Sequence, residues 1–247
     1  MLLGIDHLVI AVSDPDEAVA LLQDRLGLAP GGGGRHERLG TFNRLVWLGD
    51  SYLELIGVFD ADLAADSWVG APTLRKLEAG GGLATWAIAT DAIETDAARL
   101  RDAGSDLGQP IPGSRTRPDG RVVRWSLAAA PTLAPDGPPF LIEHDTSGAE
   151  WTPVEREERA VGPTRLDRLE LAVDDVDRTS RAFLRTVGLR FRPSLAGGGA
   201  RDADVGPQRL RLRPRRGGSP MATIAVSIAG GDPAEVELLG CRWVVGR

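Results

Sequence analysis

Three histidines and one glutamate in an apolar segment are the residues of this chain whose types could support chemistry. The histidines are His7, His36 and His144. Sites for divalent metals combine neutral imidazoles with carboxylates that are held on rigid elements. Glu54 lies in the otherwise apolar segment 52–56, where a buried carboxylate without a partner would be costly. These residues could form a metal site if the fold brings them together.

The single cysteine has no such role. With Cys241 alone, the chain can form neither an internal disulfide nor a thiolate metal cluster. Cys241 lies in the mostly apolar, strand-like segment 236–244, which favours a buried structural thiol over a nucleophile.

Charge and hydropathy exclude several classes of partner. The net charge is −6 and the pI is near 5.2, which argues against a nucleic-acid-binding protein. Arginines alternate with leucines in residues 209–213, which predicts a strand with an arginine face, or alternatively a patch for an anionic ligand. No apolar run approaches the roughly 20 residues that span a bilayer, and no signal peptide is evident. We therefore expect a cytoplasmic protein that binds neither nucleic acid nor membranes.

The elements that would position these residues follow a repeated plan of strand, acidic N-cap, amphipathic helix and glycine stop. The strands are predicted at residues 5–12, 83–90 and 166–173. The helices are predicted to end at Gly27, Gly104 and Gly188, because glycine suits the left-handed position just past a helix. Three agreements in cap, length and stop indicate three copies of one unit.

Further strands follow each predicted helix. In the first unit, residues 41–48 and 52–56 form a hairpin over a Gly-Asp turn. In the second unit, residues 122–127 pair with residues 140–144 across a long Pro/Gly loop. In the third unit, residues 209–213, 221–228 and 236–245 supply three strands, and Glu237 echoes Glu54.

The predicted fold class is therefore α+β. Tandem βαβββ units form a curved mixed sheet, a half-barrel cup with helices packed outside, and a third, looser unit follows. The predicted organisation is a paired domain over residues 1–146, a polar linker over 147–164 and a degenerate third unit over 165–247. Residues 196–206 are predicted to form a mobile loop.

Several segments resemble the vicinal oxygen chelate superfamily, which includes glyoxalases, bleomycin-resistance proteins and extradiol dioxygenases. In the first unit they are residues 5–10, 34–36, 40–45 and 52–55, and in the second unit residues 117–120, 124–125 and 139–142. These motifs are similar to the branch called the glyoxalase-like domain, and the resemblance covers roughly residues 4–146.

The resemblance implies metal ligands on the first and last strands of a unit. His7 matches the first-strand ligand and Glu54 the last-strand ligand. In the second unit Thr85, a poor ligand, stands at the histidine position, and Glu143 is by motif the closer counterpart of Glu54. If the His144 face points inward instead, a His7–Glu54–His144 set results. Such a set would suit Fe(II), Mn(II), Zn(II) or Ni(II).

Five more side chains are expected to contact a substrate, namely His36, Asn43, Trp47, Trp86 and Trp125. For the tryptophans, packing in the core is the alternative to lining a pocket. For His36, which follows a run of glycines, the alternative is a plain loop position.

The leading hypothesis is an enzyme in which a divalent metal binds two adjacent oxygens of a small substrate and stabilises the enolate or oxyanion that forms. Glu54 would be a ligand and could also be the catalytic base, in an isomerase, lyase or dioxygenase. The alternative is a binding or sequestration protein of the bleomycin-resistance type, favoured by Thr85 and by Arg168, which occupies the histidine position of the third unit. These two residues also argue against a standard glyoxalase I. The odd third unit predicts pairing with its counterpart in a homodimer.

Overall fold

The structure is a computed structural model that describes residues 1–28, 30–117, 120–145, 164–217, 220–229 and 232–246. The first unit comprises β1 (Leu2–Ala11), α1 (Pro15–Leu26), β2 (Pro30–His36), β3 (Thr41–Leu48) and β4 (Ser51–Val58). Asp14 caps α1 by accepting hydrogen bonds from the backbone N–H groups of Asp16 and Glu17. Gly27 ends the helix in the left-handed conformation, at φ 69°. The predicted start and stop of this helix are confirmed.

The second unit repeats this order and differs at the helix cap. It comprises β5 (Gly82–Thr90), α4 (Ile93–Asp102), β6 (Ile111–Thr116), β7 (Val122–Ala128) and β8 (Phe140–His144). The N-cap residue of α4 is Ala92, which offers no capping side chain. Glu143 takes over this role, because its Oε2 accepts a hydrogen bond from the Ile93 N–H at 2.9 Å. The predicted acidic cap at residues 91–94 is therefore wrong, and the capping carboxylate comes from β8.

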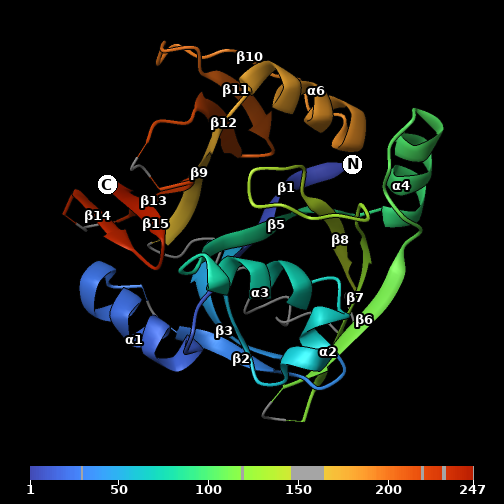
Figure 1. Ribbon diagram of the computed structural model, residues 1–247, viewed down its shortest axis with the longest axis vertical. Coiled ribbons are helices and arrows are strands. Elements are labelled where there is room, and N and C mark those ends of the chain that lie inside the picture. Colours follow the sequence, from blue (N-terminus) through green and yellow to red (C-terminus); the bar gives the residue numbers. More distant parts are fainter. Residues whose placement is uncertain (29, 118–119, 146–163, 218–219, 230–231, 247) are drawn as a thin grey trace.

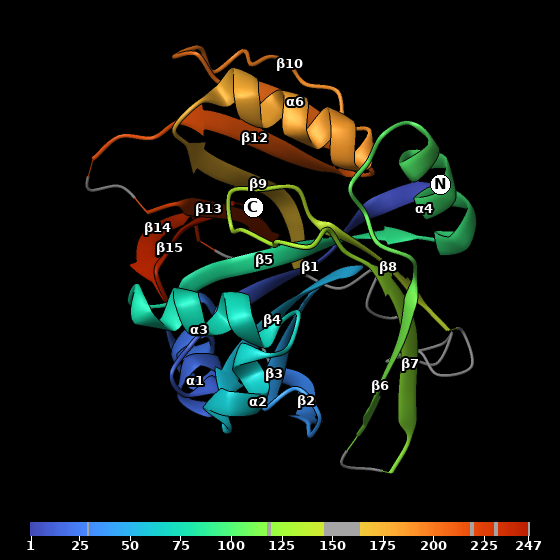
Figure 2. The ribbon, with the colours of Figure 1, turned by 45° about the vertical axis from the view of Figure 1, so that its right-hand side comes forward.

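The two units form one curved mixed sheet in the order β2-β3-β4-β1-β5-β8-β7-β6. β1 and β5 pair antiparallel at its centre, and each pairs in parallel with the last strand of its own unit. The sheet curls until its outer strands approach each other (Figure 2). There Arg115 of β6 donates a hydrogen bond from Nη1 to the Gly33 carbonyl of β2 at 2.7 Å. The α+β cup of tandem units is confirmed.

β2 was not predicted, because its glycines carry no side chains and so show no alternating pattern. The close packing of β3 explains these glycines. A Cβ at Gly31 would overlap the indole of Trp47, whose Nε1 donates a hydrogen bond to the Gly31 carbonyl at 2.9 Å. The glycine run therefore forms an edge strand that lies against a tryptophan.

A short helical insert covers one end of the cup. It comprises α2 (Ala61–Ala65) and α3 (Gly70–Glu78), between β4 and β5 (Figure 1). Val69 packs with Val9, Ile56 and Ala84 on the concave side of the sheet. The insert fills this end, so that space for a ligand is left at the other.

The second sheet contains the third unit and an incomplete fourth. The third unit comprises β9 (Thr164–Val173), α6 (Val176–Val187), β10 (Arg192–Pro193), β11 (Arg201–Val205) and β12 (Gln208–Pro214). It is followed by β13 (Ala222–Ile228), β14 (Ala234–Leu238) and β15 (Cys241–Gly246). The order is β10-β11-β12-β9-β13-β15-β14. β13 pairs antiparallel with β9 and parallel with β15, as β5 does with β1 and β8.

Four predictions for this region are therefore wrong. The strands that complete the third unit are β10, β11 and β12, and β11 occupies much of the predicted loop 196–206. Residues 236–245 form two strands, because the chain turns at Leu239 and Gly240, both at positive φ. Glu237 lies on the edge strand β14 opposite Arg242, whereas the position of Glu54 corresponds to Arg211, which pairs with Glu170 of β9.

The in-chain partner of the third unit also changes the argument for a dimer. That prediction depended on an odd unit without a partner, and β13 to β15 supply one within the chain. Dimerisation itself stays a prediction. The proposed linker, residues 147–164, lies outside the described residues except for Thr164, which begins β9.

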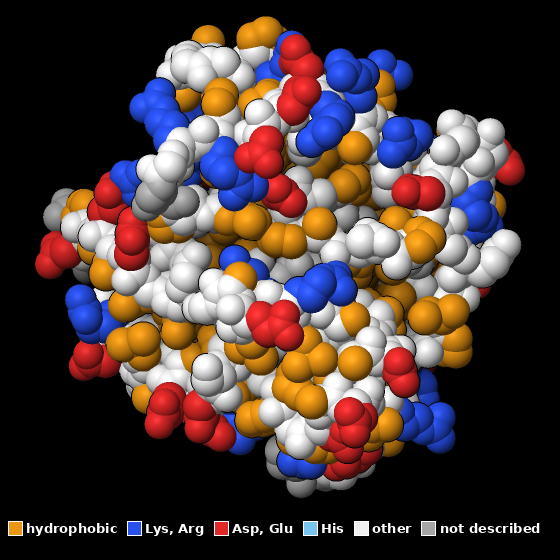
Figure 3. Space-filling model, viewed as in Figure 1, with side chains coloured by type: hydrophobic (Ala, Val, Ile, Leu, Met, Phe, Trp, Pro, Cys, Tyr) orange, Lys and Arg blue, Asp and Glu red, His pale blue; other side chains and the backbone are white. Residues whose placement is uncertain are grey.

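One hydrophobic core lies between the two sheets. It includes Leu53 and Leu55 of β4, Leu210 and Leu212 of β12, and Cys241. The predicted burial of Cys241 is confirmed, and burial raises the pKa of its thiol to about 11. In the described part of the chain, no helix has the length and apolarity needed to cross a membrane. Figure 3 shows acidic and basic side chains interspersed over the face seen in Figure 1.

The arginines of β12 are held in ion pairs on the other face of the second sheet. Asp202 accepts hydrogen bonds from Arg211 Nε at 2.7 Å and Nη2 at 3.0 Å, and from the Ser194 hydroxyl at 2.9 Å. Arg213 Nε lies 2.8 Å from Glu170. The predicted alternation of arginine and leucine is confirmed, with the arginines engaged by carboxylates.

This pairing predicts an acid-sensitive contribution to stability. The hydrogen bonds from Arg211 hold the pKa of Asp202 below its usual range. The carboxylate therefore stabilises the fold above about pH 4, and this contribution is lost as the pH falls further. We expect Asp202→Asn to lower the free energy of unfolding by about 1–2 kcal/mol at neutral pH, and by less near pH 3. Urea unfolding at both pH values tests this, and an equal loss at the two would contradict it.

Candidate functional site

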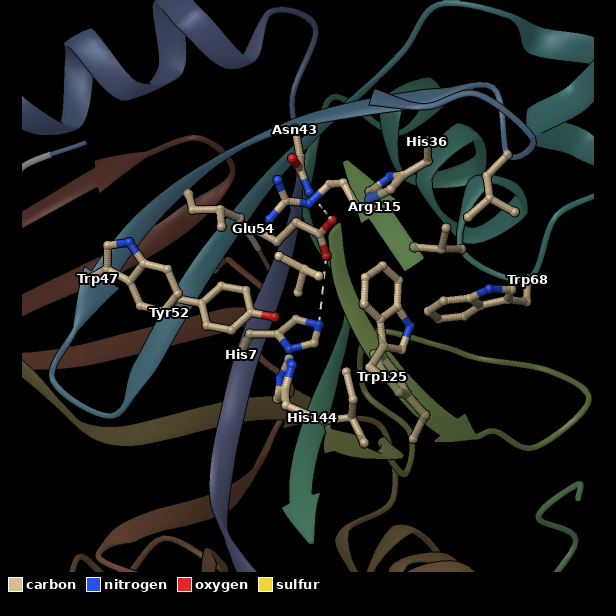
Figure 4. A pocket seen from close by; sticks show the side chains of 16 residues that line it. His7, His36, Asn43, Trp47, Tyr52, Glu54, Trp68, Arg115, Trp125 and His144 are labelled. Atoms are coloured by element: carbon tan, nitrogen blue, oxygen red, sulfur yellow. Dashed lines mark hydrogen bonds and ion pairs between the residues drawn. The ribbon is translucent and has the colours of Figure 1, made fainter. Parts of the chain in front are cut away.

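A pocket opens in the part of the cup that the helical insert leaves uncovered (Figure 4). The cavity has a volume of about 60 Å³. Polar groups line its floor, and aromatic side chains line much of its wall. The predicted residues His7, His36, Asn43, Trp47, Glu54, Trp125 and His144 all line it. The cup therefore brings together residues that are far apart in the sequence.

Glu54 and Asn43 form the fixed part of the polar floor. Tyr52 and Glu54 face the pocket, whereas Leu53 and Leu55 face the core, as strand alternation predicts. Asn43 Oδ1 accepts a hydrogen bond from the Gly34 N–H at 2.9 Å, and its Nδ2 donates to Glu54 Oε1 at 2.6 Å. The amide thus orients the carboxylate so that Glu54 Oε2 faces His7.

His7 is positioned by the preceding residue. The pairing of β1 with β5 passes from Ile5↔Ile88 directly to His7↔Ala87, so Asp6 is an extra residue in a β-bulge. The bulge allows Asp6 to contact its neighbour, with Oδ1 2.6 Å from His7 Nδ1. His7 is also held between rings, stacked on Tyr52 at 4.6 Å and against the edge of Phe140 at 5.4 Å.

His144 binds the same aspartate from the other side. Its Nε2 lies 3.2 Å from both carboxylate oxygens of Asp6. Burial would raise the pKa of Asp6, but the charge and hydrogen bonds of His144 and His7 outweigh burial and hold that pKa well below its usual range. Asp6 is therefore ionised and can only accept hydrogen bonds, so each histidine nitrogen that faces it carries a proton.

The predicted ligand set of His7, Glu54 and His144 is not formed in this arrangement. His7 Nε2 and Glu54 Oε2 face each other at 3.7 Å, but His144 Nε2 is directed at Asp6. Among the described residues, no three His, Cys, Asp or Glu side chains form a group that could hold a metal ion. A site with two histidines and one carboxylate therefore does not fit these side chains. Dependence on a divalent metal stays a prediction.

His36 and Arg115 line the upper part of the pocket in Figure 4. His36 Nδ1 lies 3.0 Å from the Thr41 hydroxyl. Burial lowers the pKa of His36, with an opposing contribution from Glu54 and a further lowering by the charge of Arg115. His36 is therefore neutral at neutral pH, and Arg115 brings a permanent positive charge to the pocket wall.

Strand pairing also corrects the predicted counterparts in the second unit. Glu54 pairs with Val9, and the residue equivalent to Val9 in the second unit is Ala87, which pairs with Phe140. Phe140 is thus the counterpart of Glu54, and Glu143 caps α4 instead. Of the four positions related by the repeat, only His7 and Glu54 carry strong ligands, because Thr85 and Phe140 occupy the other two.

Trp86 is the one predicted pocket residue that lies elsewhere. Its side chain is fully buried in the core between the sheets, stacked on Phe183 of α6 at 6.0 Å. The alternative of core packing therefore holds for Trp86. Trp47 and Trp125 line the pocket, and the ring of Trp125 meets His36 edge-on at 6.5 Å.

Four pocket residues, Tyr52, Trp68, Arg115 and Phe140, were missed from the sequence, as was Asp6, which contacts His7 from outside the pocket. The face shared by Tyr52 and Glu54 was a usable signal for Tyr52. Alternation placed Asp6 on the face opposite His7, and only the bulge overturns this. Trp68 lies in the insert and Arg115 on the far edge of the sheet, so neither belongs to a motif around His7.

Comparisons with known proteins agree with this architecture. The glyoxalase-like domain family matches residues 5–187. No curated protein matches the chain. A hypothetical protein from Staphylococcus aureus, known from its crystal structure, is 15% identical with a TM-score of 0.81, over 98% of each chain. This likeness shows that both sheets belong to one shared fold.

Smaller proteins match about 60% of the chain and with lower scores. Methylmalonyl-CoA epimerase from Streptomyces coelicolor, solved as a variant in complex with 2-nitronate-propionyl-CoA, is 23% identical, with a TM-score of 0.45, over 60% of this chain and 99% of its own. The corresponding epimerase from Mycobacterium tuberculosis is 19% identical, with a TM-score of 0.43, over 58% and 87%. Because the family match spans more than half of the sequence, this chain belongs to the glyoxalase-like domain family of the vicinal oxygen chelate superfamily.

Proposed function

We propose that this protein is an enzyme that transfers a proton on a small molecule, at a carbon next to a carbonyl group. The observation that carries the proposal is the 3.7 Å separation of His7 Nε2 and Glu54 Oε2 at the floor of the pocket. Both residues are buried, with exposed fractions of 3% and 8%. The close approach of two buried groups that can both accept a proton needs a functional explanation.

The hydrogen bond to Asp6 determines which nitrogen of His7 can accept a proton. Because Asp6 can only accept, the proton of a neutral His7 is on Nδ1, and Nε2 presents a lone pair. Glu54 Oε2 presents a second acceptor across the gap. A proton that arrives between these two acceptors can be bound by both of them. The pair is therefore suited to take a proton from a bound molecule.

The proposed step follows from this arrangement. A C–H bond next to the substrate carbonyl breaks, its proton goes to His7 Nε2, and its electron pair moves onto the carbonyl oxygen. The imidazolium that forms lies between the carboxylates of Asp6 and Glu54. The enolate has the Arg115 guanidinium in the same pocket as its counter-charge. Return of the proton to either carbon, or to the other face, gives an isomerase.

The walls indicate the size and shape of the substrate. Trp125 and Trp68 stand on one side of the pocket and Tyr52 with Trp47 on the other (Figure 4). The mostly aromatic and apolar lining suits a molecule with a small, flat or apolar body. The polar groups lie together at the floor, so the oxygens of the substrate are expected to be neighbours in the molecule, as the superfamily resemblance implies.

Exchange of substrate protons with solvent tests the proposal without knowledge of the product. A panel of small 2-oxo acids, hydroxyketones and 1,3-dicarbonyl compounds would be incubated with the protein in deuterated water and followed by proton NMR. We expect the protein to accelerate deuterium incorporation at the carbon next to the carbonyl of at least one compound. If compounds that bind the pocket by chemical-shift perturbation show no acceleration, the proposal fails.

A metal titration tests the remaining prediction of metal dependence. Two donors among the residues that the structure describes face each other at the floor, whereas structural or catalytic metal sites in proteins use about three or four protein ligands. We therefore expect Mn(II), Ni(II), Zn(II) and Fe(II) to leave the melting temperature unchanged, and chelators to leave deuterium exchange unchanged. A rise in melting temperature that His7→Ala abolishes would instead support a metal site.

The aromatic wall favours binding without catalysis as the second candidate function. The ring centroids of Trp68 and Phe140 are 5.0 Å apart, and those of Trp47 and Tyr52 are 4.8 Å apart. Aromatic rings therefore stand on two sides of the space for a ligand. In that case ligands would bind equally well to wild type and to a Glu54→Gln variant, and neither protein would accelerate exchange. Calorimetric titration identifies ligands that bind both proteins, and the rate of deuterium exchange of those ligands separates the two functions.

A further inference from the structure

The presentation of Asp6 and His7 depends on what holds the bulge of β1. On one side, β5 leaves Asp6 out of its pairing. On the other side, parallel pairing with β4 begins only at His7↔Tyr52. Ile5, the residue before the bulge, therefore pairs with Ile88 of β5 and has no partner in the register with β4. Its hydrogen bonds identify the group that takes the place of that partner.

A glutamine from the third unit satisfies the backbone of Ile5. Gln208 Oε1 accepts a hydrogen bond from the Ile5 N–H at 3.0 Å. The Ser51 hydroxyl donates to the Ile5 carbonyl at 2.6 Å, and Gln208 Nε2 donates to that hydroxyl at 3.0 Å. Gln208 is 6% exposed and Ser51 fully buried. The amide thus bridges β1 and β4 immediately before the bulge.

The backbones on both sides of this contact are shaped for it. A Cβ at Gly4 would lie 2.7 Å from Gln208 Oε1. In the turn between β11 and β12, Gly206 has φ 58°, and a Cβ there would overlap the Leu3 carbonyl oxygen. Glycine at both positions lets the turn touch β1. Gln208 begins β12 and pairs with Val205, so the side chain extends from a rigid hairpin.

Gln208 does not reach the aromatic pocket. It lines a neighbouring groove between the two halves of the chain, together with Gly4, Asp6, His144 and Pro207. Any effect of Gln208 on His7 therefore passes through the backbone of Ile5 and the carboxylate of Asp6.

We infer that Gln208 is a positioning residue for the site, through which the third unit holds the bulge that places Asp6 against His7. This inference shares one residue, His7, with the proposed function and rests on that function in no other way. It gives the second sheet a role in the site of the first. Without the amide, the Ile5 backbone loses a buried hydrogen bond, and the bulge can relax toward regular pairing, which turns Asp6 away from His7.

The test uses the proton on His7 Nδ1 as its signal. A proton held between nitrogen and carboxylate at 2.6 Å is expected to resonate far downfield and to exchange slowly with water. The variant Gln208→Met keeps the length of the side chain and removes both hydrogen bonds. Ser51→Ala removes the bridging hydroxyl and leaves Gln208 intact. Proton NMR of histidine-labelled protein is recorded for wild type and for both variants.

Ser105→Ala is the matched control. Its hydroxyl donates a hydrogen bond to the Thr186 carbonyl at 2.7 Å, so this variant weakens another contact between the two halves, away from β1. We expect the His7 signal to be lost in Gln208→Met and Ser51→Ala and kept in Ser105→Ala. An unchanged signal in the first two, or its loss in all three, overturns the inference. If Gln208→Met does not fold, Ser51→Ala decides.

This readout needs no substrate. A protein that fails to exchange substrate protons but shows the expected pattern of His7 signals would sink the proposed function and leave the positioning role intact. The reverse result would sink the positioning role alone.

Discussion

Replacing Glu54 by glutamine is expected to lower the rate of substrate deuterium exchange by about 10²–10³-fold, with little change in substrate affinity. Glutamine keeps the shape of the side chain and removes the negative charge 3.7 Å from His7 Nε2. The imidazolium formed by proton transfer then loses one of its two flanking carboxylates. The measurement is the initial rate of exchange for a compound found in the NMR screen, at saturating and subsaturating concentration.

Glu143→Gln is the matched control, because the sequence motif made Glu143 the counterpart of Glu54 in the second unit. Its carboxylate accepts a hydrogen bond from the first residue of α4 and does not line the aromatic pocket. Glutamine can still accept this hydrogen bond, so we expect exchange at close to the wild-type rate. Equal losses in the two variants, or a Glu54→Gln variant as active as wild type, would show that the paired acceptors are not the proton-transfer groups.

Trp86→Ala is expected to lower the free energy of unfolding by about 3–5 kcal/mol. The Trp86 side chain is fully buried in the core between the two sheets and stacks on Phe183 of α6. Truncation leaves a cavity at this junction, which the neighbouring strands and α6 cannot close. Because natural domains are stable by only about 5–15 kcal/mol, a loss of this size is a large part of the whole. Urea or guanidinium unfolding measures it.

Trp125→Ala provides the contrast, since both tryptophans were predicted to line the pocket. Trp125 is half-buried in the pocket wall, opposite the edge of the His36 ring. We expect Trp125→Ala to lower the free energy of unfolding by less than half as much as Trp86→Ala does. We also expect it to raise the KM of the exchanged compound about tenfold or more. If Trp86→Ala instead impaired binding while keeping its stability, the assignment of Trp86 to the core would be wrong.

Much of the fold could be predicted because its signals are local. Alternation placed Tyr52 and Glu54 on one face, and the caps Asp14 and Gly27 marked the ends of a helix. These preferences act within a few residues and survive whatever the rest of the chain does. The repeat of this local plan was enough to predict tandem units, and the resemblance to the vicinal oxygen chelate superfamily pointed to His7 and Glu54.

The tertiary structure decided how these residues are used. The bulge that turns Asp6 to His7 is set by β5 and by Gln208, about 200 positions away in the sequence. Strand pairing, and not motif, made Phe140 the counterpart of Glu54, and packing of the second sheet drew Trp86 into the core.

The sequence by itself determined the repeated unit and the caps of α1, and its resemblance to a known superfamily pointed to the two residues that face each other across the floor of the pocket. Only the tertiary structure decided that His144 binds Asp6 and does not join His7 and Glu54 in one ligand set. The physical reason is that a local pattern fixes the face on which a side chain lies. The atom that it meets there depends on strands that the chain brings in from elsewhere.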